Sequence, residues 1–156
     1  MAILQQTVFS PRYGFDFAND MINSFKATEA LAYGKIVEPA NTTGILALGD
    51  EYGYFLMEEV TADGPSREEL IMGDYQYEKK ATSNTAVSVL IPRKGAVVRT
   101  KWVVKGDGGV DIAVGNKLNI ANGVYVTVSG NAGTKGLLKN IYVDSLGNTL
   151  YDVEIL

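Results

Sequence analysis

Apolar and polar residues alternate along several short stretches of this chain, which is the pattern of half-buried β-strands. In residues 96–105 the even-numbered positions from Val98 to Val104 form one face. Arg99 and Lys101 occupy the middle of the other face, which is therefore predicted to be solvated. Similar patterns predict strands at residues 34–38, 45–48, 53–60, 70–72, 86–91, 123–129, 137–143 and 149–155.

Glycine separates these stretches. The chain has 17 glycines in 156 residues, more than the roughly 7% of average proteins. Many short strands joined by tight turns are typical of sandwiches and small barrels. The last two strands are predicted to form a hairpin around the turn cluster 144–148, with Leu150 opposite residues 141–143. The predicted fold is mainly β, a compact small β-barrel or β-sandwich.

One short helix is predicted, at residues 19–25. Met21, Ile22 and Phe25 have helical spacing, and Asn19 or Asp20 is a suitable N-cap. The fold is therefore expected to contain at most one short helix.

The first 30 residues differ from the rest of the chain. Residues 9–17 hold four aromatic side chains without a regular period through Pro11 and Gly14. We predict an extended aromatic N-terminal arm with the candidate helix at residues 1–30, and a single β-domain at residues 31–156. The arm either covers its own domain as an irregular lid or anchors on a neighbouring subunit or partner. Its candidate partner-binding residues are Phe9, Arg12, Tyr13, Phe15 and Phe17.

If the arm anchors on a partner, deletion of residues 1–17 is expected to leave a folded domain that no longer docks.

Histidine and cysteine are both absent. Imidazole bases, thiolate nucleophiles, disulfides and Cys/His metal sites are therefore excluded. Carboxylates remain, but the adjacent residues of Glu58-Glu59 and of Glu68-Glu69 would point to opposite faces of a strand. The chain is expected not to be an enzyme and to need no cofactor or metal.

The net charge of −4 divides into −7 for residues 1–80 and +3 for residues 81–156. This asymmetry reflects either ordinary solvated faces or a bipolar particle, which would bind a charged partner or pair with its own copies head to tail. A pI near 4.8 argues against a nucleic-acid partner, and Trp102 is interpreted as a core residue. Apolar runs do not exceed four residues, so no membrane span is expected.

The Gly- and Asp-rich residues 105–111 match neither a P-loop nor an EF-hand and are predicted to connect strands.

A carbohydrate-binding module is an alternative from another functional class. Tyr52 shares a predicted strand face with Tyr54, and Tyr75 shares one with Tyr77. Such pairs form either a sugar-stacking surface or a cross-strand ladder that stabilises a sheet.

The order of motifs between residues 30 and 130 points to a family. The run Ala32-Tyr33-Gly34-Lys35-Ile36-Val37-Glu38 follows the aromatic segment, and residues 54–60 and 86–104 come next. The turn at residues 113–118, with Asn116 where an Asp is typical, then leads into the β run 123–129. This layout resembles the capsid cement, or head decoration, proteins of tailed bacteriophages.

The resemblance implies a structural protein on the outside of a virion, made in the host cytoplasm. Such a protein would bind the major capsid protein, stabilise contacts between capsomers and form a homotrimer. A tail or baseplate module of a virion is the alternative.

Overall fold

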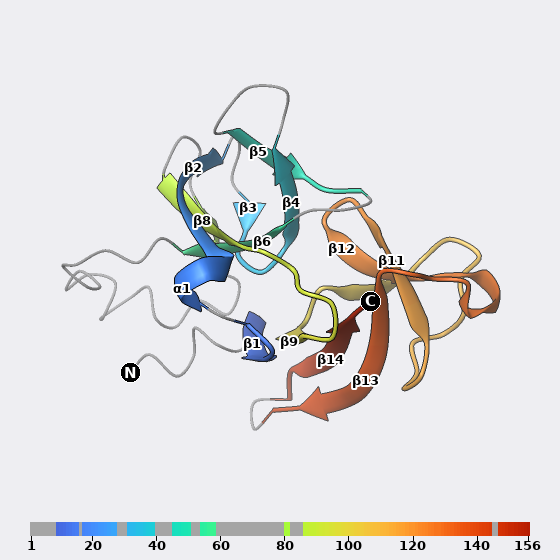
Figure 1. The fold of residues 1–156 in the computed structure, drawn as a ribbon. Coiled ribbons are helices and arrows are strands. Elements are labelled where there is room, and N and C mark those ends of the chain that lie inside the picture. The colour runs from blue at the N-terminus through green and yellow to red at the C-terminus, as the bar shows by residue number, and fades with distance from the viewer. Residues whose placement is uncertain are drawn as a thin grey trace.

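The structure is a computed structural model, shown in Figure 1, that describes residues 9–15, 17–27, 31–39, 45–50, 54–58, 80–81, 86–144 and 147–156. The fold is mainly β with a closed barrel, as predicted, and it also contains a larger sheet. In chain order the elements are β1 (Phe9–Tyr13), α1 (Phe17–Asp20), β2 (Met21–Ala27), β3 (Leu31–Ala32), β4 (Ile36–Pro39), β5 (Ile45–Leu48), β6 (Tyr54–Glu58), β7 (Lys80–Ala81), β8 (Ala86–Leu90), β9 (Val97–Thr100), β10 (Val103–Lys105), β11 (Lys117–Ala121), β12 (Val124–Thr127), η3 (Ser129–Asn131), β13 (Gly136–Val143) and β14 (Thr149–Ile155).

Within the described residues, the barrel is closed by strands β2, β5, β4, β6 and β8 in that order. Strand β2 runs parallel to β5 and antiparallel to β8. Figure 1 shows the barrel as the blue to green half of the molecule. Small and branched side chains fill its interior: Ala27, Leu31, Val37, Leu46, Leu56, Val87 and Val89.

The larger sheet has the strand order β1-β9-β14-β13-β11-β12-β10 in the described part of the chain. Strands β9 and β10 stand near opposite ends of this order, yet only Lys101 and Trp102 separate them in sequence. The two ends of the sheet must therefore lie close together, so the sheet curls back on itself. Buried residues such as Val98, Leu138 and Val153 belong to the core of this curled sheet.

The barrel packs against the curled sheet through strands that are buried on both faces. In β6, Leu56 faces the barrel interior, and its neighbour Phe55 joins the core of the sheet. Strand β8 repeats this arrangement with Val89 and Leu90. This burial on both faces explains the continuous apolar run at residues 54–57, because each face of β6 packs against a core.

A tight turn joins β11 to β12 and docks on the barrel. Asn122 and Gly123 both have positive φ, at 49° and 80°, as a two-residue turn of the Asn-Gly type requires. The Gly123 N–H donates to the Gly49 carbonyl at 2.7 Å, and the Ile36 N–H donates to the Gly123 carbonyl at 2.8 Å. The sequence prediction began a strand at residue 123 and missed β11, although the Asn-Gly pair was a usable signal for a hairpin.

The helix predicted at residues 19–25 is wrong. Helix α1 ends at Asp20, and the following residues form β2. Strand β2 pairs with β8, with Met21 opposite Leu90 and Phe25 opposite Val87. Sheet pairing therefore overrides a weak local helical pattern.

The single strand predicted at residues 96–105 is also wrong. The chain leaves one end of the sheet after Thr100 and rejoins the other end at Val103. The break inverts the alternation, so that Val103 is buried and Val104 is exposed. Pairing partners on two different strands, β14 for β9 and β12 for β10, cause this break.

Other strand predictions are confirmed. Strand β5 has the predicted bounds, and the β13–β14 hairpin places Tyr142 opposite Leu150. Residues 106–116 connect β10 to β11. The strand predicted at residues 70–72 lies outside the described residues.

The described strands of residues 1–30 belong to both sheets. Strand β1 is extended and forms the edge of the curled sheet beside β9, and β2 closes the barrel beside β8. Strands before and after the predicted boundary at residue 30 therefore pair with each other.

Candidate partner-binding surface

The five candidate residues of the arm have different environments. Phe9 is buried, and its ring centroid lies 5.1 Å from that of Phe55. Phe15 packs against the same core. Arg12 and Tyr13 are exposed, Tyr13 by 63%, and Phe17 begins helix α1. Partner binding by these five residues stays a prediction. Arg12 and Tyr13 are exposed for it, whereas Phe9 and Phe15 contact their own domain.

The buried position of Phe9 corrects the expectation that deleting residues 1–17 leaves a folded domain. Such a deletion removes edge strand β1 and a ring that contacts Phe55 in the core. Removing a buried Phe side chain alone destabilises a protein by about 3–5 kcal/mol. Partner binding must therefore be tested by substitutions at exposed positions.

Strand register places the exposed Tyr13 on the same sheet face as Tyr142. Residues directly opposite each other share a face, as do residues two apart on a regular strand. Tyr13 is opposite Val97, and Arg99, two residues on, is opposite Asp152. Asp152 is opposite Asn140, two residues before Tyr142. We call this side of strands β1, β9, β14 and β13 the outer face.

One ion pair holds the middle of the outer face in place. Arg99 binds both carboxylate oxygens of Asp152, from Nε at 2.8 Å and from Nη2 at 3.1 Å. The hydrogen bond to Asp152 is the largest cause of the raised pKa of Arg99, opposed by burial. The Arg99 guanidinium carbon lies 4.3 Å from the centre of the Tyr142 ring. Tyr142 is therefore oriented by a charge that is itself fixed by two hydrogen bonds.

The β13–β14 hairpin extends beyond the rest of the sheet. Strand β13 pairs with β11 only at Leu137 and Gly136, and no strand of the described part pairs with the far edge of its second half. Residues 139–143 are exposed on both faces, including three apolar side chains in a row: Ile141, Tyr142 and Val143. Free edges and apolar patches of this kind are frequent sites of protein association.

The sequence prediction did not single out this hairpin tip. A usable signal was present, because Ile141-Tyr142-Val143 breaks the alternation directly before the turn cluster that begins at Asp144. Tyr13 and Tyr142 are near opposite ends of the sequence, so only the sheet register brings them to one face.

Trp102 lies between the barrel and the sheet rather than on the outer face. Its indole N–H donates to the Tyr33 carbonyl at 3.1 Å. The Nζ atoms of Lys35 and Lys101 lie 4.8 and 4.6 Å from the ring centre. Burial, and secondarily the charge of Lys35, lowers the pKa of Lys101. The ring is half-buried, and these contacts indicate a role in joining the two parts of the fold.

Only some of the other candidate residues from the sequence analysis lie among the described residues. Tyr54 is half-buried and packs against the barrel core, whereas Tyr52, Tyr75 and Tyr77 lie outside the described residues, as do Glu59, Glu68 and Glu69. Lys105 and Asp111 pair at 2.8 Å across the Gly-rich connection. Among the described residues, no group of three or more acidic side chains is placed to hold a metal ion.

Comparison of the chain with protein-family models, with curated proteins and with solved structures finds no match. In the part of the chain that the structure describes, no helix has the length and apolar character needed to cross a membrane.

Proposed function

We propose that this chain is a structural virion protein that binds the outer surface of a tailed-phage capsid and stabilises contacts between capsomers. The observation that supports this proposal best is the outer face, which carries Tyr13 and Tyr142 around a fixed Arg99–Asp152 pair. The layout resemblance described above points to the same role.

The outer face has the physical properties of a docking surface. Tyrosine supplies a large contact area with few rotors to immobilise, and aromatic side chains are enriched among the residues that dominate binding energy. The Arg99–Asp152 ion pair within this face restrains β9 and β14, so less conformational freedom is lost on binding.

Weak binding by one copy is sufficient in this role. A homotrimer that engages three equivalent sites on a shell converts the second and third contacts into intramolecular events, which raises the overall affinity strongly. The trimer is part of the proposal. Native mass spectrometry of the purified chain distinguishes it from the hexameric ring that a tail module would form.

The docking test uses the full-length protein and expanded empty heads of the phage that encodes it. In a co-sedimentation assay, we expect the double variant Tyr13→Ser/Tyr142→Ser to bind heads about tenfold more weakly or worse, because two aromatic anchors are lost. Val114→Ser is the matched control, since Val114 is 59% exposed but lies in the β10–β11 connection. Circular dichroism and thermal melting check that both variants fold.

Two results would contradict the proposal. The wild-type protein would fail to bind heads at any concentration tested, or the double variant would bind as tightly as the wild type.

A further inference from the structure

A cavity of about 140 Å³ lies between the barrel and the curled sheet. The barrel contributes Ile36 and Phe55 to its wall, and the sheet contributes Ile120, Tyr125 and Ile155. An apolar protein cavity of about 150 Å³ accommodates a benzene molecule. The space therefore fits a ligand body of about one aromatic ring.

Tyr125, which lines this cavity, carries a buried polar group. The residue is only 3% exposed, and in the described structure its hydroxyl has no hydrogen-bond partner. Burial raises the pKa of Tyr125 far above its ordinary value, so the hydroxyl stays protonated and able to donate. A buried donor without an acceptor costs free energy and is rare in folded proteins. A ligand oxygen in the cavity would satisfy it.

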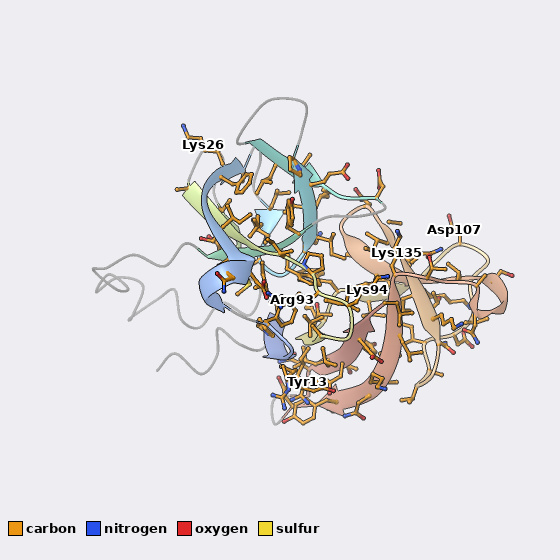
Figure 2. All side chains as sticks on the ribbon, viewed as in Figure 1. Tyr13, Lys26, Arg93, Lys94, Asp107 and Lys135 are labelled. Atoms are coloured by element: carbon orange, nitrogen blue, oxygen red, sulfur yellow. The ribbon has the colours of Figure 1, made fainter. Side chains whose placement is uncertain are left out.

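Two lysines line the same cavity, Lys94 and Lys135. Backbone hydrogen bonds fix the turns that carry them: the Gly95 N–H donates to the Ile155 carbonyl at 2.7 Å, and the Lys135 N–H donates to the Leu118 carbonyl at 3.0 Å. Within the described part of the chain, neither ammonium group makes an ion pair. Figure 2 labels the two lysines near each other, close to the middle of the view.

Among the described residues, the charged side chains of the cavity wall are cationic: Lys94 and Lys135 line it and no acidic side chain does. Leu156, the last residue of this sequence, also lines the cavity, and its terminal carboxylate adds one negative charge without forming an ion pair to either lysine. By contrast, Lys105 pairs with Asp111 and Lys139 pairs with Glu154. Two unpaired ammonium groups beside an apolar space attract an anion that carries an apolar body.

We propose that this cavity binds a small amphipathic carboxylate. Its ring or branched alkyl body contacts Phe55 and Ile120, its carboxylate pairs with Lys94 and Lys135, and the Tyr125 hydroxyl donates to one of its oxygens. This site is distinct from the outer face and does not depend on the capsid role.

Benzoate is the probe, titrated into the full-length protein and followed by two-dimensional NMR. We expect saturable shifts at cavity residues with a dissociation constant of about 1 mM or tighter, a modest value for a ligand of this size. Acetate lacks the ring and benzyl alcohol lacks the charge. Each is expected to bind about tenfold more weakly than benzoate or worse, because it loses either the apolar contact or the ion pairs.

Variants locate the binding site. Lys94→Gln/Lys135→Gln is expected to weaken benzoate about tenfold and to leave benzyl alcohol unchanged. Tyr125→Phe is expected to weaken benzoate several-fold. Lys26→Gln is the matched control, because Lys26 is an exposed lysine that Figure 2 shows at the far end of the barrel. It should bind benzoate as the wild type does.

The proposal is overturned if benzoate produces no saturable shifts up to about 20 mM, because this concentration is far above the dissociation constant expected for the cavity. It is also overturned if the double lysine variant, shown to be folded by its spectrum, binds benzoate as tightly as the wild type or no more weakly than Lys26→Gln does.

Discussion

At the scale of single residues, strand β12 shows how burial is decided. Its alternation separates Val124 and Val126 from Tyr125 and Thr127, and either face is a reasonable core face by sequence. The structure buries Tyr125 and Thr127 and leaves the two valines half-buried. Tyr125 has a larger side chain than either valine, and its ring centroid lies 6.5 Å from that of Phe55.

Removal of the Tyr125 hydroxyl should stabilise the free protein. Tyr125→Phe keeps the ring and deletes a buried donor that has no partner among the described residues. We expect the free energy of unfolding to rise by about 1 kcal/mol, measured by urea denaturation without ligand. Tyr142→Phe is the control, and it should change stability little because Tyr142 is exposed. A loss of stability in Tyr125→Phe would show that the hydroxyl has an acceptor.

At the scale of elements, the β13–β14 hairpin was predictable because its signals are local. Asp144 directly follows β13, and its carboxylate accepts from the backbone N–H and the side-chain amide of Asn148 at 2.9 and 3.2 Å. Asp and Asn favour turns through such short-range hydrogen bonds. By contrast, the predicted helix at residues 19–25 failed because its real partner, β8, lies more than sixty residues away along the chain.

Loss of the Asp144 side chain should weaken this hairpin. We expect Asp144→Ala to lower the free energy of unfolding by about 1–2 kcal/mol, since two hydrogen bonds to a carboxylate are lost. Denaturation reports the total effect, and amide hydrogen exchange reports where β13 and β14 open.

Asp107→Ala is the matched control for that variant. Asp107 is exposed in the β10–β11 connection, as Figure 2 shows, and its carboxylate makes no hydrogen bond within the described structure. If both variants were equally stable, the Asp144 contacts would not hold the turn.

At the scale of the whole molecule, the junction between barrel and sheet depends on Gly123. A Cβ at this position would lie 2.6 Å from Leu48 Cδ2 and 3.0 Å from the Ile36 carbonyl oxygen. Its backbone also bonds to both Gly49 and Ile36. A glycine is needed here for close approach as well as for positive φ.

Gly123→Ala should therefore destabilise the protein more than an alanine at a glycine whose only special feature is a positive φ. We expect it to lower the free energy of unfolding by about 2–4 kcal/mol, from backbone strain and from overpacking at the junction. Gly95→Ala is the matched control, because Gly95 has φ +83° and nothing within 4 Å of an added Cβ. It should cost about 1–2 kcal/mol. Equal losses in thermal or urea unfolding would mean that the junction tolerates a methyl group.

The sequence by itself determined the mainly β fold, most strand positions, the final hairpin and the absence of His and Cys chemistry. These features follow from composition, period-two alternation and turn residues, which act over a few positions. It also placed Arg12 and Tyr13 among five candidate partner-binding residues, but it did not point to Tyr142 or the hairpin tip.

The tertiary structure decided the rest: the division into a closed barrel and a curled sheet, the burial of Phe9, the outer face and the cavity with Tyr125 and two lysines. Each of these depends on which distant strands pair and which face of a strand is covered. Local patterning restricts those choices without selecting one, because pairing energy comes from contacts between segments far apart in the chain.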